Sequence, residues 1–126
     1  MDAIRVERLD HVAINVTDVA RAQAFYGGLL GLKEIPRPQS FTFPGAWFQC
    51  GPEVLHLLGR KEPDAGRSSH FALWVADVRA AARVFEAAGH PVKWDQAKIP
   101  GVERFFVRDP DGNRVEIQGS DSGLQI

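Results

Sequence analysis

Two segments of the chain share one pattern of apolar and polar positions. Residues 11–19 read HVAINVTDV, and residues 70–78 read HFALWVADV. In both, a histidine opens an alternating run and Asp-Val closes it at the eighth and ninth positions. Alternation with a period of two is typical of a half-buried strand. We therefore predict two equivalent strands, one beginning at His11 and the other at His70.

A helical pattern follows each predicted strand. Apolar residues recur at steps of three and four through residues 19–30, and again through residues 78–88. The expected capping residues are Thr17 or Asp18 and Asp77 at the N-terminal ends, and Gly31 and Gly89 at the C-terminal ends. The sequence thus predicts two strand–helix units of the same design.

Further strand-like runs follow each helix. They are expected at 33–36, 46–50 and 54–58 in the first half, and at 91–94, 103–108 and 113–118 in the second. The stretch DPDGN at 109–113 predicts a turn, and the polar stretch GRKEPDAGRSS at 59–69 reads as a linker. The chain is therefore predicted to be a single domain, 1–126, of α+β class. It consists of βαβββ modules at about 6–58 and 68–118, which are too small to bury their sheets separately.

The two repeated strands place their histidines on the face away from the helices. The aliphatic and aromatic positions of each strand share one face, which suits packing against the following helix. His11 and His70 then lie on the other face, beside the small side chains of Ala13 and Ala72 respectively. This arrangement leaves space for a ligand above each sheet.

Composition limits the functional classes. The chain has 126 residues, 44% of them hydrophobic and 25% charged, and a net charge of −1, which gives no basis for binding nucleic acid or membrane. There is no long apolar run and no apolar region typical of a secretory signal near the N-terminus. Cys50 is the single cysteine, so we expect a cytoplasmic protein in which this thiol is structural and buried. A small-molecule substrate is the expected partner.

The last strand of each half supplies two further polar positions. His56 lies within VLHLLG and Glu116 within RVEIQG, at matching places of the repeat. If the halves pair about a pseudo-twofold axis, His11, His56, His70 and Glu116 come together, and this donor set suits Zn²⁺, Ni²⁺, Co²⁺, Mn²⁺ or Fe²⁺. Taken alone, each histidine would be a structural residue and Glu116 a solvated one. The remaining histidine, His90, matches nothing and is expected in a surface loop.

Four stretches of the chain resemble the vicinal oxygen chelate superfamily. They are LDHVAINVTDVARAQAFYGGLLGL, FPGAWFQCGPEVLHLLG, HFALWVADV and FFVRDPDGNRVEIQ. This superfamily includes glyoxalase I, fosfomycin- and bleomycin-resistance proteins, methylmalonyl-CoA epimerase and extradiol dioxygenases. The resemblance implies paired βαβββ modules forming a cupped mixed sheet, with the four matched residues around a divalent metal. It also implies a homodimer, with the cup formed either within one chain or across two.

The predicted chemistry is metal-assisted proton transfer by a glyoxalase-like lyase or isomerase. The substrate would be a small vicinal-oxygen compound, either a hydroxy-ketone or an α-ketoaldehyde adduct, with Glu116 as the base. The glyoxalase I type carries two ligand carboxylates, so His56 argues against true glutathione-dependent activity. Two alternatives remain open: an Fe(II) extradiol-type dioxygenase using two histidines and one carboxylate, and a non-catalytic binding or resistance protein.

Aromatic and cationic residues are predicted to form the substrate pocket. The candidate wall residues are Phe41, Phe43, Trp47, Trp74, Arg104 and Phe106, with membership of the core as the alternative for the aromatic ones. A fosfomycin-type site would also need a cationic pocket, for which Arg37, Arg104 and Arg108 are the candidates.

Overall fold

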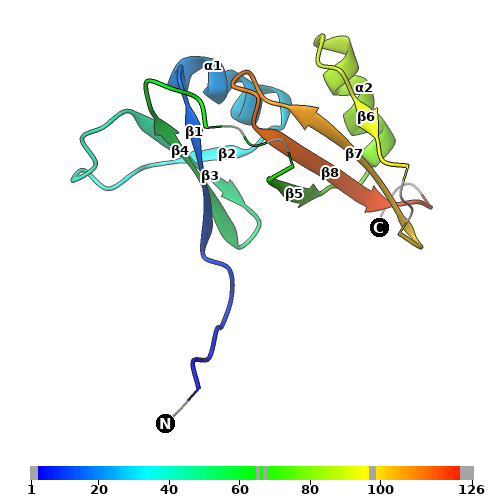
Figure 1. The fold of residues 1–126 in the computed structure, drawn as a ribbon, viewed down its shortest axis with the longest axis horizontal. Coiled ribbons are helices and arrows are strands. Elements are labelled where there is room, and N and C mark those ends of the chain that lie inside the picture. The colour runs from blue at the N-terminus through cyan, green and yellow to red at the C-terminus, as the bar shows by residue number, and fades with distance from the viewer. Residues whose placement is uncertain (1–2, 65, 67, 97–98, 123–126) are drawn as a thin grey trace.

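The two predicted modules are present and lie side by side. The computed structural model describes residues 3–64, 66, 68–96 and 99–122. Figure 1 shows the two modules next to each other, with an N-terminal segment that projects away from both. Each module has the predicted βαβββ order, so the α+β class and the duplication are confirmed.

The first module precedes the linker and the second follows it. The first contains β1 (His11–Val16), α1 (Val19–Gln23), the π-helix η1 (Ala24–Leu29), β2 (Lys33–Ile35), β3 (Gly45–Cys50) and β4 (Glu53–Gly59). The second contains β5 (His70–Trp74), α2 (Val78–Ala87), β6 (Lys93–Trp94), β7 (Val102–Arg108) and β8 (Arg114–Ser120).

The two modules have the same sheet topology. The strand orders are β1-β4-β3-β2 and β5-β8-β7-β6. In each sheet the repeated strand pairs in parallel with the last strand of its module, and the other pairs are antiparallel. The repeated strands β1 and β5 therefore each form one edge of a sheet.

Both helical segments begin and end as predicted, although the first passes from an α-helix into a π-helix. The side chain of Asp18 accepts a hydrogen bond from the Arg21 N–H, and that of Asp77 accepts one from the Ala80 N–H, both at 3.0 Å. The positive φ angles of the C-terminal glycines are 70° at Gly31 and 84° at Gly89. The pattern predicted one helix through residues 19–30, whereas the structure has a π-helix from Ala24.

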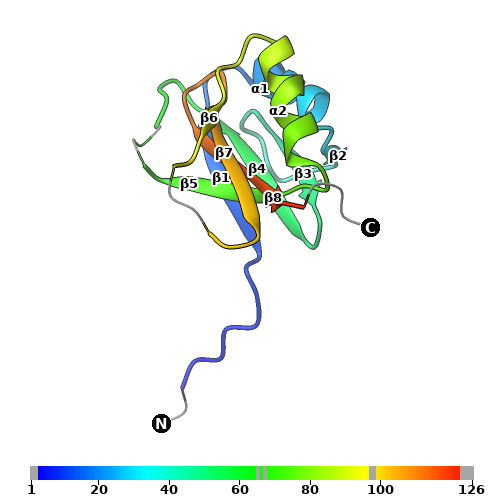
Figure 2. The ribbon, with the colours of Figure 1, turned by 90° about the vertical axis from the view of Figure 1, so that its right-hand side faces the viewer.

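The core lies between the helices and the aliphatic faces of the sheets. Figure 2 shows both helices on the same side of the strands. The fully buried side chains include Val16, Phe48, Leu55 and Leu57 in the first module, and Phe105, Val107, Val115 and Ile117 in the second. In β1, Val12, Ile14 and Val16 pack on the core, and in β5, Phe71 and Leu73 do so, while His11 and His70 are exposed. The predicted facing of the two strands is therefore confirmed.

A buried polar network joins the two modules. The Tyr26 hydroxyl donates a 2.7 Å hydrogen bond to Asp109, whose carboxylate also accepts one from the Asn113 side chain at 2.9 Å. Asn113 in turn donates to the Asn15 carbonyl at 3.0 Å. Burial, and then the nearby Asp109 carboxylate, raise the pKa of Tyr26 far above its ordinary value. The predicted turn at 109–113 therefore also holds the second module against the first.

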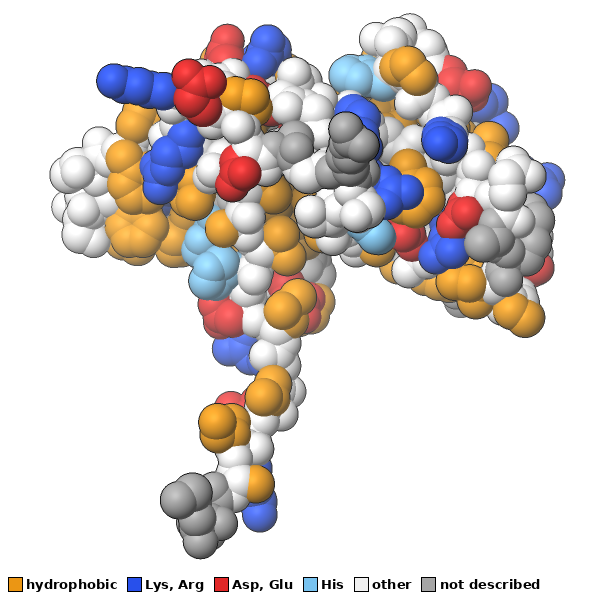
Figure 3. Space-filling model, viewed as in Figure 1, with side chains coloured by type: hydrophobic (Ala, Val, Ile, Leu, Met, Phe, Trp, Pro, Cys, Tyr) orange, Lys and Arg blue, Asp and Glu red, His pale blue; other side chains and the backbone are white. Residues whose placement is uncertain are grey.

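Residues 3–10 form an extended N-terminal arm. The first module was expected to begin at about residue 6, but its first strand begins at His11. Apolar side chains along the arm are exposed: 93% for Ile4, 84% for Val6 and 62% for Leu9. Figure 3 shows hydrophobic side chains, in orange, along the segment below the body of the protein. Among the described residues, no helix is both long enough and apolar enough to cross a membrane.

Candidate metal centre

The sheet register confirms that the two halves present equivalent positions. His56 on β4 has Ala13 of β1 as its partner on one side and Trp47 of β3 on the other. At the matching position on β8, Glu116 lies between Ala72 of β5 and Phe106 of β7. In both halves, therefore, the polar side chain stands between an alanine and a large aromatic residue.

His11 and His56 form the first polar pair. Their imidazole rings stack with centroids 4.1 Å apart and planes inclined by 13°. The Nδ1 atom of His11 lies 2.8 Å from the Asp10 carboxylate, and this hydrogen bond lowers the pKa of Asp10. A carboxylate that holds one imidazole nitrogen leaves the other nitrogen, Nε2, as a metal donor.

His56 is held in the form that binds metals. Burial, and then the neighbouring His11, lower the pKa of His56 below its ordinary value of 6.5. Neutral imidazole is the metal-binding form of histidine, because a proton on the donor nitrogen blocks coordination.

His70 and Glu116 form the second polar pair. The Nε2 atom of His70 lies 3.1 Å from Oε1 of Glu116, and its Nδ1 lies 2.7 Å from the Ser68 carbonyl. The carbonyl only accepts, so Nδ1 must carry the proton, and Nε2 of a neutral ring then presents a lone pair to a carboxylate. Two acceptors this close require a proton or a cation between them. The donor geometry of this pair therefore fits a bound metal ion.

Arg104 and Asp95 extend the second pair. Arg104 lies 3.7 Å from the second carboxylate oxygen of Glu116 and 2.6 Å from the Asp95 carboxylate. Glu116 is only 4% exposed, and burial of a carboxylate requires such compensating partners.

The two pairs do not join into one site within the chain. Among the described residues, no three histidine, cysteine, aspartate or glutamate side chains are grouped closely enough to hold a metal ion. The structure therefore brings His11 to His56 and His70 to Glu116, as two halves of the predicted donor set.

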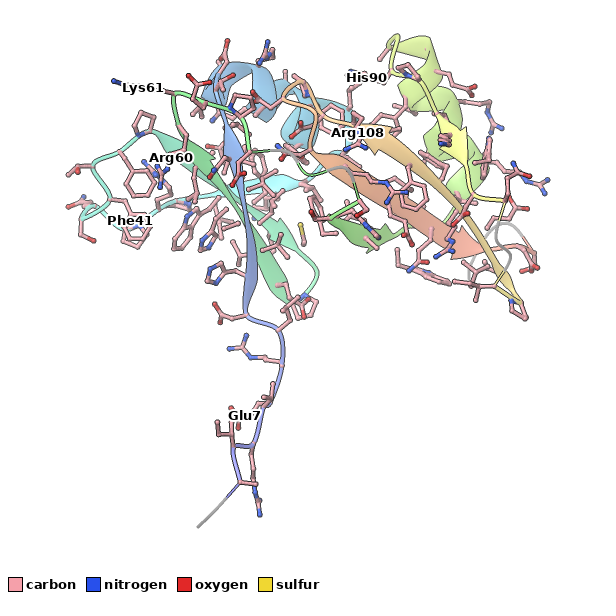
Figure 4. The ribbon with its side chains drawn as sticks, in the orientation of Figure 1. Glu7, Phe41, Arg60, Lys61, His90 and Arg108 are labelled. Carbon is pink, nitrogen blue, oxygen red and sulfur yellow. The ribbon has the colours of Figure 1, made fainter. Side chains whose placement is uncertain are left out.

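The predicted pocket residues divide between the two halves. In the first half, Trp47 stacks on His56 with ring centroids 4.0 Å apart, and Phe41 meets Trp47 edge-on at 5.5 Å. Phe43 packs against Phe41 at 5.6 Å, and the Arg60 guanidinium lies over Phe43 at 5.0 Å. Figure 4 labels Arg60 and Phe41, both on the first module. Arg60 was not predicted, since the sequence places it in the linker.

In the second half, Phe106 and Trp74 accompany Arg104. Phe106 meets His70 edge-on at 5.4 Å, and the Arg114 guanidinium covers the Phe106 ring at 3.6 Å. Trp74 shares the strand face of His70 and is 50% exposed. Arg114 was also missed, because nothing in a lone arginine of a strand marks it as stacking on a neighbouring ring.

Two of the arginines considered for a cationic pocket have structural contacts. Arg37 donates a hydrogen bond to the Phe43 carbonyl, and Arg108 donates to the carbonyls of Gly66 and Gly112. Arg104 lies beside Glu116 of the second polar pair.

The remaining cysteine and histidine lie apart from both pairs. Cys50 is half-buried, and burial followed by the charge of Glu53 raises the pKa of its thiol, which does not suit a nucleophile. His90 follows α2 in a loop, as predicted, but its ring is partly buried and packs edge-on against Phe25 at 5.1 Å.

Comparison with known proteins gives one consistent result. Residues 8–117 match the family model described as the Glyoxalase/Bleomycin resistance protein/Dioxygenase superfamily. A lactoylglutathione lyase from Salmonella typhimurium is 30% identical, over 92% of this chain and 96% of its own length. A protein named Glyoxylase I 4 from Arabidopsis thaliana is 27% identical, over 94% of this chain and 74% of its own length. The crystal structure of a glyoxalase family protein from Bacillus anthracis aligns with a TM-score of 0.86 at 30% identity, over 95% of this chain and all of that one.

Proposed function

Because this chain belongs to the Glyoxalase/Bleomycin resistance protein/Dioxygenase superfamily, we propose that it is a divalent-metal-dependent lyase or isomerase of the glyoxalase type. The observation that carries the proposal is the second polar pair, in which Nε2 of His70 faces the Glu116 carboxylate at 3.1 Å while its Nδ1 is engaged by Ser68. A proton on Nε2 or a cation between the two atoms satisfies both groups, and a divalent metal ion is the cation that suits an imidazole and a carboxylate.

The proposed metal ligands are His11, His56, His70 and Glu116. Three imidazoles and one carboxylate suit Zn²⁺, Ni²⁺, Co²⁺, Mn²⁺ or Fe²⁺ and are a poor set for Mg²⁺. The groups that hold the two histidines match in the two halves. The Asp10 carboxylate lies within hydrogen-bond distance of Nδ1 of His11, and the Ser68 carbonyl does the same for His70. Both histidines are thereby oriented to coordinate through Nε2.

The complete centre is proposed to form between two copies of the chain. Each copy holds one pair in each module, and among the described residues the two pairs do not combine within a chain. In a twofold dimer, His11 and His56 of one copy can meet His70 and Glu116 of the other, which gives two identical centres. Each centre then has its four ligands.

The proposed reaction is proton transfer between adjacent carbons of a hydroxy-ketone or an α-ketoaldehyde adduct. When bound, the metal acts as a Lewis acid that polarises neighbouring substrate oxygens. The Glu116 carboxylate accepts a proton from the carbon that bears one oxygen and returns it to the adjacent carbon, so the substrate is isomerised without redox change. Arg104 lies 3.7 Å from the other oxygen of this carboxylate and favours its charged form.

The pocket residues of both halves would surround the substrate. Trp47 and Phe41 supply an apolar wall in the first half, and Phe106 and Trp74 supply one in the second. Arg104 lies between the Asp95 and Glu116 carboxylates, so its charge compensates these two groups at the edge of the pocket. The relatives named lactoylglutathione lyase and Glyoxylase I 4 support the reaction class.

Metal analysis and isotope exchange test the proposal. The protein, purified without chelators and reloaded with Mn²⁺, Ni²⁺ or Zn²⁺, should bind about one ion per chain. It should also catalyse deuterium exchange from D₂O into dihydroxyacetone or the adduct of methylglyoxal with a thiol. Glu116→Gln should abolish the exchange, while Glu103→Gln, at an exposed ion pair with Arg79, should leave it intact. Wild-type protein that binds metal but exchanges no proton with either compound would overturn the enzymatic role for this substrate class.

A further inference from the structure

Two arginines of the first module carry charges that no carboxylate compensates. Arg37 lies in the loop 36–44 between β2 and β3, and Arg60 directly follows β4. In the described part of the chain, neither forms an ion pair with an aspartate or a glutamate. Arg104 differs, because it lies beside two carboxylates. The charges of Arg37 and Arg60 are therefore available to an anionic ligand.

The two guanidinium groups meet at one aromatic ring. The Arg37 group lies 5.3 Å from the ring centroid of Phe43, and the Arg60 group lies 5.0 Å from it. Backbone carbonyls hold both groups in place, since Arg37 donates to the Phe43 carbonyl at 2.7 Å and Arg60 to the Gly59 carbonyl at 3.0 Å. Two like charges at one ring repel each other, and an anion between them would remove that repulsion.

The Arg37 guanidinium lies over the same side of the sheet as His56. A Cβ at Gly45 would collide with the Leu57 carbonyl and would stand 2.7 Å from Nη1 of Arg37. Gly45 precedes Trp47 by two positions on β3, so the two residues face the same side, and Trp47 stacks on His56. The guanidinium thus lies about 7 Å along the strand from Trp47.

Two buried donors at this place have no acceptor. Nη1 of Arg37 and Nε1 of Trp47 are both buried, and neither has a hydrogen-bond partner among the described residues. A buried N–H group without an acceptor costs free energy, and the cost is greater for a charged group. An oxyanion is the ligand group that best satisfies a guanidinium, through parallel charge-assisted hydrogen bonds.

The Phe41 ring adjoins both of these side chains. It meets Trp47 edge-on at 5.5 Å, and the Arg37 guanidinium lies 5.8 Å from its centroid. Phe41 belongs to the loop 36–44, which has no helix or strand and in which the Phe41 N–H donates to the Pro38 carbonyl at 3.0 Å. Figure 1 shows this loop, in cyan, at the end of the first module that is farthest from the second. Phe41 is therefore the side chain whose rotation would open both donors to a ligand.

We propose that Arg37 and Arg60 bind an oxyanion, either a carboxylate or a phosphate, at the end of the substrate remote from its reacting carbons. This inference rests on the proposed function and names the substrate class of that site. Phe41 turns outward, so that Nη1 of Arg37 reaches the oxyanion and Nε1 of Trp47 becomes accessible. Because Arg37 lies two strand positions beyond the residue that stacks on His56, a spacer of about four to six atoms separates the oxyanion from the reacting carbons.

A series of matched hydroxy-ketones tests the charge and the spacing. Three of them share a spacer of five methylene groups and end in a carboxylate, a phosphate or a neutral carboxamide, and a fourth carries its carboxylate on one methylene group. In wild-type protein, the KM for deuterium exchange should be about tenfold lower for one or both long anionic compounds than for the carboxamide. The anion with the lower KM identifies the group for which the site is built. Equal KM values for the charged and neutral compounds would overturn the inference.

Substitution of each arginine tests its part in binding. Arg37→Gln and Arg60→Gln should each raise the KM of the preferred long anion about tenfold, while kcat and the KM of the carboxamide stay within about threefold. Arg79→Gln removes a charge elsewhere and should change neither constant. Arg60 is exposed, so its variant tests the site even where a change at Arg37 disturbs the loop. Equal effects on the long and short carboxylates, or on the charged and neutral compounds, would overturn the inference.

Protection of the arginines from phenylglyoxal gives a measurement that does not depend on catalysis. In the metal-loaded protein, mass spectrometry should show that the preferred long anion slows modification of Arg37 and Arg60 about fivefold or more. The carboxamide should not protect them, and Arg79 in the same digest serves as the internal control. Phe41→Ala should speed the modification of Arg37 in the absence of ligand, and an unchanged rate would overturn the covering role of Phe41.

The two measurements also separate this inference from the proposed function. Protection by the anion without proton exchange would retain the oxyanion site and overturn the proposed reaction. Proton exchange without protection, and with no preference for charged compounds, would retain the reaction and overturn the oxyanion site.

Discussion

Trp47 covers one face of the His56 imidazole, with the two rings parallel to within 2° and their centroids 4.0 Å apart. The other stacking partner of His56 is His11, at 4.1 Å. His56 is thus enclosed between two rings, which explains why burial is the main cause of its lowered pKa.

We expect Trp47→Ala to raise the pKa of His56 in the metal-free protein towards 6.5, its ordinary value. Removing the indole lets water reach the ring, and water stabilises the protonated form. NMR titration of the His56 ring resonances measures the change. Trp47→Phe keeps an aromatic cover and serves as the control. A pKa that is unchanged in Trp47→Ala would show that Trp47 does not desolvate His56.

The lowered pKa of His56 also predicts a pH dependence of stability. The folded state binds the His56 proton more weakly than the unfolded state, so stability from this residue is present above 6.5 and is lost as pH falls towards the folded pKa. In metal-free protein, His56→Gln should make the loss of stability below this pH less steep. Urea unfolding at several pH values measures the slope, and a steeper slope in the variant would contradict the assignment.

Tyr26→Phe should destabilise the protein by about 1–3 kcal/mol, because the buried Asp109 carboxylate loses one of its donors. The Tyr26 hydroxyl lies 2.7 Å from that carboxylate and joins the modules. Urea unfolding measures the difference. The ion pair of the exposed Arg79 with Glu103 gives the control, since solvent screens it and Arg79→Gln should cost much less than Tyr26→Phe. Equal losses of unfolding free energy in the two variants would contradict a stabilising role for the buried network.

Cys50 should react slowly with iodoacetamide at pH 8 in the folded protein. Its pKa is raised by burial and by the charge of Glu53, and the thiolate is the reactive form. The rate should increase in urea and when the pH passes well above 9, its ordinary pKa. Mass spectrometry follows the alkylation. A folded-state rate equal to that in urea would contradict the half-buried position of this thiol.

The repeat in the sequence predicted most of the fold, because strands and helix caps depend on residues close together in the sequence. The alternation after His11 and His70, and the caps at Asp18 and Asp77, depend on neighbours in sequence. The contact of Tyr26 with Asp109 joins residues 83 positions apart, and no local pattern encodes such a pair.

The repeat also predicted which positions of the two halves correspond, while the metal site itself stays a prediction. The repeat identified the matched positions of His56 and Glu116, and the register confirms their equivalence. It could not show that the two polar pairs stay separate within a chain, since this depends on how the modules pack. Ser68 engages His70 through its backbone carbonyl, which the identity of a side chain does not reveal.

The central claim is that each metal centre takes His11 and His56 from one copy and His70 and Glu116 from another. The most direct test mixes two variants, one with His11→Ala and His56→Ala and the other with His70→Ala and Glu116→Ala, each alone unable to form a centre. After unfolding and refolding together in equal amounts, heterodimers contain one intact centre, so the mixture should bind about one quarter of the wild-type metal. If each centre lay within a single chain, the mixture would bind no more metal than the separate variants, and the account would be contradicted.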